Sequence, residues 1–155
     1  MHRESRYDTL LRALSARLRA DTALCWANST LMRVPFFSAC VEDDFRASVA
    51  LSLTTRVFCR SEAVPIDALL VVERGIAAKN GRLKTKGGYL GEDFLVQWAA
   101  LRDTDPAIAL TFVLQFAVIS KRHLEELLGD FPLARWRVRI FSFRIALVRV
   151  MKSMA

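Results

Sequence analysis

Hydrophobic positions near the start of the chain repeat with the period of an α-helix. Leu10, Leu14 and Leu18 are four residues apart with arginines on the other face, which predicts an amphipathic helix. A second helix is predicted from about Val41 to Leu53, because the acidic residues in its first turn suit the positive end of the helix dipole. Between them, the residue before Pro35 is expected to leave the helical conformation. The first third of the chain is therefore expected to be helical.

The middle of the chain has the pattern of β-strands. Residues 55–59 have the side chains of a strand, and Ala68–Glu73 is an almost continuous apolar run that suits a buried strand. Asn80-Gly81 predicts a tight hairpin, because both central residues of such a turn must accept positive φ. A short helix is predicted from Phe94 to Leu101, and one or two buried strands are predicted within residues 108–119.

The last part of the chain is predicted to be helical again. Ser120 is the expected N-cap of a helix that runs to Leu128, and Gly129 is expected to end it. Pro132 then suits the first turn of a final helix. This order indicates an α+β fold, an antiparallel β-roll or jelly roll flanked by N-terminal and C-terminal helices.

Charge is concentrated at the C-terminal end. The 155-residue chain has a net charge of +7 and a mean hydropathy of +0.23, and residues 133–155 carry six basic side chains and no acidic one. A basic helix of this kind can bind acidic protein, nucleic acid or anionic lipid headgroups. The alternative is that its arginines are solvated beside an apolar stripe that packs on the rest of the protein.

Little in the sequence indicates catalysis. Cys25, Cys40 and Cys59 form no C-x-x-C pair and are expected to be reduced cytosolic thiols, two of them in the core. No Ser/His/Asp set, carboxylate pair or metal-ligand cluster stands out, so we do not expect an enzyme. No apolar stretch reaches the roughly 20 residues of a transmembrane helix, so a membrane location would depend on surface contact or on sequence outside these residues.

The strongest candidate site is the glycine-rich stretch from Gly87 to Leu95. Backbone N–H groups at a turn that enters a helix lack intrahelical partners and attract anions. Glu92 could accept a hydrogen bond from a sugar hydroxyl. Together these features suit a phosphorylated, ribose-containing ligand.

Several segments in register resemble the cyclic nucleotide-binding domain. Leu31–Phe37 resembles its V-P-x-F entry, and Glu73-Arg74-Gly75 resembles its strand-to-turn R-G. Gly88–Glu92 resembles the F-G-E start of the phosphate-binding cassette, with Leu90 in place of phenylalanine, and Ile119–Pro132 is similar to the last strand and following helix. Leu14–Leu24 is similar to the end of the C-linker found in cyclic-nucleotide-gated and related voltage-gated channels.

The resemblance implies three parts and a channel function. Residues 1–34 would be C-linker-like helices, residues 35–132 the nucleotide-binding-like roll, and residues 133–155 the basic C-terminal helix. The chain would be the cytoplasmic regulatory domain of a voltage-gated cation channel, selective for potassium. Its partners would be the rest of the channel and its sister subunits in a homotetramer at the membrane, with anionic lipid headgroups at the basic helix and no nucleic acid.

The same resemblance locates a candidate ligand site and a defect in it. The implied site residues are Leu90, Gly91, Glu92, Asp93 and Asp105. Asp105 stands where the family has its phosphate-binding arginine, and a carboxylate repels phosphate, so binding of cyclic AMP or cyclic GMP is expected to be weak or absent.

Two further expectations concern the rest of the site. The chain is shorter than the family between residues 58 and 69, where an additional strand is usual. Phe141, Phe143 and Met151 of the last helix are candidates to cover or fill the nucleotide pocket.

The alternative function is a soluble basic adaptor on the same scaffold, which binds acidic protein or nucleic acid through residues 133–155.

Overall fold

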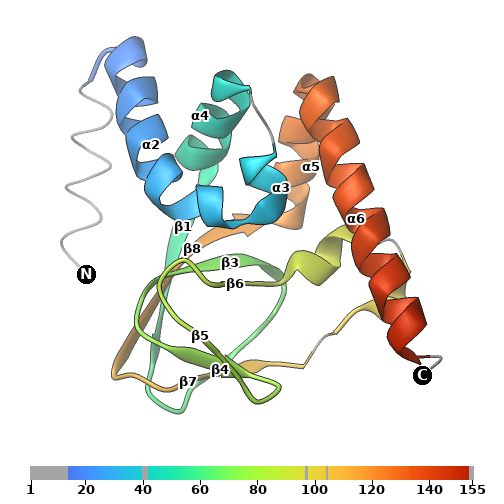
Figure 1. Cartoon of the computed structure of the whole chain (residues 1–155). Helices are drawn as coiled ribbons and strands as arrows, with labels where there is room; N and C mark the ends of the chain where they lie inside the picture. The colour runs from blue at the N-terminus through green and yellow to red at the C-terminus, as the bar shows by residue number, and fades with distance from the viewer. Residues whose placement is uncertain (1–13, 40–41, 97, 104, 154–155) are drawn as a thin grey trace.

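Two four-stranded antiparallel sheets and a set of helices make up an α+β fold (Figure 1). This computed structural model describes residues 14–39, 42–96, 98–103 and 105–153. The helices α2, α3 and α4 lie together on one side of the sheets, and the long helix α6 runs down their edge. The α+β class predicted from the sequence is confirmed.

The elements follow the predicted order of helices, strands and helices. The helices are α2 (Ala16–Thr30), α3 (Pro35–Ser38), α4 (Asp43–Ser52), α5 (Lys121–Asp130) and α6 (Pro132–Ser153), with short 3-10 helices η1 (Leu31–Arg33), η2 (Glu92–Leu95) and η3 (Ala99–Leu101). The strands are β1 (Thr54–Cys59), β2 (Ala63–Val64), β3 (Ala68–Arg74), β4 (Ala77–Lys79), β5 (Arg82–Lys84), β6 (Tyr89–Leu90), β7 (Ala107–Ala109) and β8 (Val113–Ser120).

The first sheet, ordered β1-β8-β3-β6, is buried on both faces at its centre. Leu69 and Val71 of β3 belong to the core shared with the helices. Their neighbours Leu70 and Val72 face the second sheet, ordered β2-β7-β4-β5. Side chains of a strand alternate between faces, so a strand covered on both sides needs apolar residues throughout. This explains the continuous apolar run of β3.

Aromatic rings connect the helical layer to α6. Phe36 of α3 lies 4.3 Å from Phe37 and 5.3 Å from Phe141 of α6, measured between ring centroids. Phe45 of α4 lies 5.4 Å from Phe131, which immediately precedes α6. Phe36, Phe37 and Phe45 are almost completely buried, so this cluster fixes the first half of α6 against the body of the protein.

Local signals in the sequence predicted several boundaries correctly. Ser120 caps α5 by accepting a hydrogen bond from the His123 N–H at 3.2 Å. Asn80 and Gly81 have φ values of 49° and 71° at the β4–β5 hairpin. Val34 is extended before Pro35, which begins α3.

Other local predictions were wrong. Gly129 does not end α5, which continues to Asp130 because Leu128 and Phe131 keep the chain packed on the helical core. Cys25 and Cys59 are exposed rather than core residues. Leu18 of the predicted N-terminal stripe is half exposed, while Leu10 and Cys40 lie outside the described residues.

Within the described parts of the chain, every helix is too short or too polar to cross a bilayer.

Candidate functional site

The backbone of the predicted cassette depends on Gly91. Its φ of 85° lies in the left-handed region, and a Cβ at this position would lie 2.0 Å from the carbonyl oxygen of Ala68. Leu90, immediately before it, is 2% exposed and packs inside the two sheets. Gly91 therefore turns the chain out of β6 and allows η2 to begin directly against β3.

The helix that follows is shorter than the sequence predicted. Residues 94–101 do not form one helix. Instead η2 and η3 are single 3-10 turns, and Val96, at the end of η2, is extended. An anion site at a helix start depends on several aligned peptide dipoles and unpaired N–H groups. The four-residue η2 is a single turn, so it supplies few aligned dipoles to such a site.

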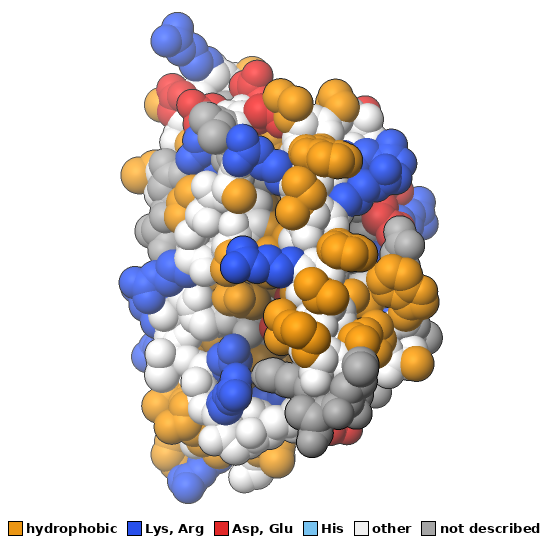
Figure 2. Space-filling view, turned by 45° about the vertical axis from the view of Figure 1, so that its right-hand side comes forward, with side chains coloured by type: hydrophobic (Ala, Val, Ile, Leu, Met, Phe, Trp, Pro, Cys, Tyr) orange, Lys and Arg blue, Asp and Glu red, His pale blue; other side chains and the backbone are white. Residues whose placement is uncertain are grey.

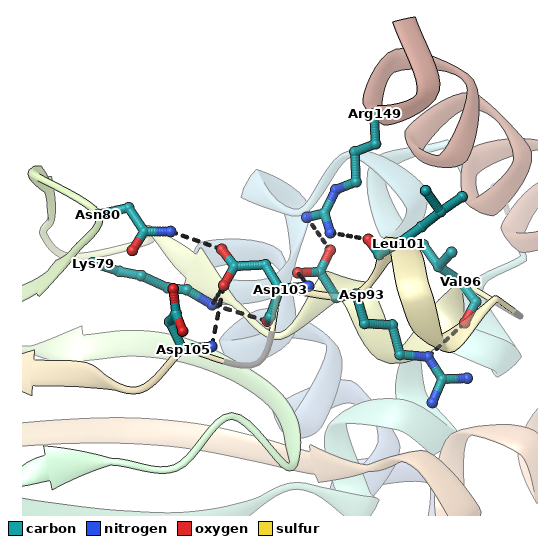
Figure 3. A network of polar contacts seen from close by, with 9 residues as sticks. Lys79, Asn80, Asp93, Val96, Leu101, Asp103, Asp105 and Arg149 are labelled. Atoms are coloured by element: carbon teal, nitrogen blue, oxygen red, sulfur yellow. Dashed lines mark hydrogen bonds and ion pairs between the residues drawn. The ribbon is translucent and has the colours of Figure 1, made fainter. Parts of the chain in front are cut away.

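Asp93 is the buried polar centre of this region (Figure 3). One of its carboxylate oxygens forms an ion pair with the guanidinium of Arg149 from α6. The other accepts a hydrogen bond from the backbone N–H of Asp103 at 3.1 Å. Arg149 also donates to the carbonyl oxygen of Leu101. One arginine thus connects α6 to both 3-10 turns, η2 and η3, of the segment between β6 and β7.

Asp103 extends these contacts to the β4–β5 hairpin. Its Oδ1 lies 3.3 Å from the Lys79 ammonium and accepts from the Asp105 N–H at 3.1 Å. Its Oδ2 accepts from the Asn80 amide at 2.8 Å. Arg149, Asp93, Asp103 and Lys79 therefore form a connected row of polar contacts, which we call the latch, between α6 and the hairpin.

Glu92 lies beside the latch in a half-buried position. Burial raises its pKa above the ordinary value, and the neighbouring charge of Asp93 acts in the same direction, while Lys84 and Arg149 oppose it. Burial raises the pKa of the nearby Tyr89, and the negative charge of Glu92 raises it further. The Lys84 ammonium stands 5.4 Å from the centre of the Tyr89 ring, a cation–π contact.

The structure brings Gly91, Glu92 and Asp93 together and connects Asp105 to them through Asp103. The Asp105 side chain is exposed, and its carboxylate adds a further negative charge near the end of the cassette. Arg102 is the nearest arginine in sequence, but its Nε donates to the carbonyl oxygen of Val96 at 2.8 Å, within the same segment.

The three side chains of the last helix that were candidates to cover or fill a pocket lie in different surroundings. Phe141 packs against Phe36 in the helical core. Phe143 and Met151 are 63% and 56% exposed. Arg149 of α6 reaches the cassette with its charged group, through the ion pair with Asp93.

Sequence reasoning missed Arg149, Lys79 and Asp103. The helical period of α6 carried a signal for the first of these, because Val138, Ser142 and Arg149 recur on one face and Val138 is buried. Ser142 donates to the carbonyl oxygen of Leu95 at 2.7 Å on that same face. No comparable signal pointed to Lys79 or Asp103, since their pairing depends on how the hairpin folds back.

The arrangement disfavours an anionic ligand. A phosphate near the cassette would meet the carboxylates of Asp93, Asp103 and Asp105, while Arg149 and Lys79 already pair with two of them. Among the described residues, no group of acidic, cysteine and histidine side chains is arranged to hold a metal ion.

Comparison with models of known protein families and with curated proteins finds no match for this chain.

Proposed function

We propose that the chain is a regulatory module of the cyclic nucleotide-binding type, acting on the cytoplasmic side of a voltage-gated cation channel, with a site that its own latch keeps closed. The observation that carries the proposal is the pairing of Arg149 with Asp93 at the start of the cassette-like segment. In this module, docking of α6 takes the role that a bound nucleotide would otherwise have.

The strand pairing supports a jelly roll of the kind found in that family. β1 pairs with β8, β2 with β7, β3 with β6 and β4 with β5, all antiparallel. In an eight-stranded jelly roll the first strand pairs with the last, the second with the one before the last, and so on inward. The pairs are divided between two sheets. Because one fold can carry many functions, the strand pairing supports only the fold. The activity has to be argued from the site.

The chemistry of the latch supports the absence of strong nucleotide binding. A cyclic phosphate is normally held by a charge-assisted, often bidentate arginine contact. Here the position implied for that arginine is Asp105, and the arginine that does reach the segment is neutralised by Asp93. A nucleotide would have to displace Arg149 and meet uncompensated carboxylates.

Calorimetric titration with cyclic AMP and cyclic GMP tests the closed site. We expect the unmodified chain to bind either nucleotide more weakly than about 100 μM. Asp105→Arg should bind at least about tenfold more tightly, because it replaces repulsion by a charge-assisted contact. Micromolar binding by the unmodified chain would show that the latch does not close the site.

The channel assignment needs a separate test. Mapping the transcript that encodes Met1 should reveal upstream coding sequence with six apolar spans, an arginine-rich fourth span and a T-x-G-[YF]-G filter. A transcript that lacks them would remove the channel assignment and leave the nucleotide-binding-type scaffold in place.

A further inference from the structure

One face of α6 is hydrophobic yet exposed along its whole length (Figure 2). The exposed residues alternate at spacings of three and four: Leu133, Trp136, Ile140, Phe143, Leu147 and Val150, whose exposed fractions run from 64% to 39%. We call this row the seam. A three-four alternation is the a/d pattern with which one helix packs against another. The other face of α6, which includes Ala134, Val138 and Ala146, already packs on the protein.

Beside the seam lies a concave groove between α5 and α6. Its volume is about 920 Å³, and its walls include Phe94, Trp98, Leu124, Leu128, Trp136 and Phe143. Trp98 and Trp136 are 54% and 64% exposed. Large exposed apolar patches on a protein surface mark sites of interaction. A groove beside a ridge of apolar side chains fits the curved surface of a helix better than the flat surface of a bilayer.

Positive charge borders the seam on both sides. Arg139 occupies a g position and Arg144 an e position of the heptad pattern, and Arg135 lies at the rim of the groove. All three are exposed, and none forms an ion pair within the part of the chain that the structure describes. Figure 2 shows basic side chains on either side of the hydrophobic row.

These charges select the partner. In paired helices, residues at e and g of one helix face those of the other, so opposite charges attract and like charges repel. Two copies of α6 would bring Arg139 and Arg144 of each close to those of the other. A second copy is therefore disfavoured, and a helix with acidic flanks is favoured.

We propose that the seam and its groove bind an amphipathic α-helix of another protein, with hydrophobic residues at a and d and glutamates or aspartates at e and g. The surface faces away from the latch side of α6, so the proposal is independent of nucleotide binding and of the channel assignment.

The experiment uses the whole 155-residue chain and two labelled synthetic peptides of about four heptads. Both peptides carry leucine at a and d. One has glutamate at e and g, and its control has lysine there. Fluorescence anisotropy at low salt should show the glutamate peptide binding at least about tenfold more tightly, with the difference shrinking as added salt screens the charges.

Two variants make the test specific. Arg139→Glu/Arg144→Glu should reverse the preference, so that the lysine peptide binds more tightly. Ile140→Ser/Phe143→Ser should abolish binding of both peptides. All four side chains are exposed, so circular dichroism of each variant should match that of the parent chain.

Three results would overturn the proposal. One is equal affinity of the parent chain for both peptides. Another is a dimer in sedimentation velocity that Ile140→Ser/Phe143→Ser converts to monomer, which would assign the seam to a second copy. The third is binding to phosphatidylserine-containing vesicles, lost in the same variant, with no binding of the glutamate peptide, which would assign it to a membrane surface.

Discussion

Asp93 is paired through both of its carboxylate oxygens, one with the guanidinium of Arg149 and the other with the backbone N–H of Asp103. Its side chain is only 8% exposed, whereas that of Arg149 is 27% exposed. The Asp93 carboxylate is therefore the group whose charge most needs the ion pair. Without Arg149 it would remain a buried charge with a single backbone partner.

Arg149→Met should destabilise the protein by about 2 kcal/mol, because removal of one partner leaves the Asp93 charge uncompensated. Urea unfolding measures the change. Asp93→Asn combined with Arg149→Met should recover most of the loss, since no buried charge then remains. Arg144→Met, on the exposed face of the same helix, is the matched control and should change the free energy of unfolding by less than about 0.5 kcal/mol. Equal effects of the two arginine substitutions would contradict a structural role for the latch.

Gly91→Ala should destabilise the protein by about 3 kcal/mol or more. Any Cβ would meet the Ala68 carbonyl oxygen at 2.0 Å, and the φ of 85° is strained for alanine. Thermal unfolding should show a lower Tm. An unchanged Tm would mean that the turn after β6 can shift without cost.

Gly129→Ala should have the opposite sign. Gly129 lies within α5, and an added Cβ would meet no atom within 4 Å. Alanine is favoured over glycine inside a helix by about 0.5–1 kcal/mol. Urea unfolding should therefore show a gain of that size, and a loss would indicate that α5 does end at this residue in solution.

Glu92→Gln should stabilise the protein at pH 7 and lose this advantage at acid pH. Burial raises the pKa of Glu92 in the folded chain above its ordinary value of 4.5. The folded state thus holds the proton more tightly than the unfolded chain. The contribution of Glu92 to stability is then full below pH 4.5 and is lost as the pH rises through the folded pKa. Unfolding of both proteins at pH 4 and pH 7 tests this, and a destabilised Gln variant at pH 7 would refute it.

Features determined by neighbours in sequence were predictable, and those determined by distant contacts were not. The Ser120 cap and the Asn80-Gly81 hairpin each need only a few adjacent residues, so local chemistry decided them. Gly129 illustrates the opposite case, because packing of the residues around it extended α5 beyond a local stop signal.

The site was predictable in part. The glycine-rich turn that contains Gly91 was recognised from the sequence, as were the acidic residues that follow it. The partner of Asp93 was not recognised, because Arg149 is far from Asp93 in sequence. The two side chains meet only when α6 packs against the segment after β6. The arginines of α6 look alike in sequence, yet their position on the helix makes Arg149 structural and leaves Arg139 and Arg144 exposed.

The contact between Arg33 and Gly87 has a consequence for sequence change. Arg33 of η1 donates to the Lys86 carbonyl oxygen at 2.9 Å, and its Cδ lies 2.1 Å from where a Cβ on Gly87 would stand. A side chain at position 87 would therefore displace Arg33 from the Lys86 carbonyl, and the φ of 81° would be strained for any residue other than glycine. In homologous sequences an arginine at 33 should therefore be accompanied by glycine at 87, and that pair would identify relatives that share this junction between the helices and the cassette.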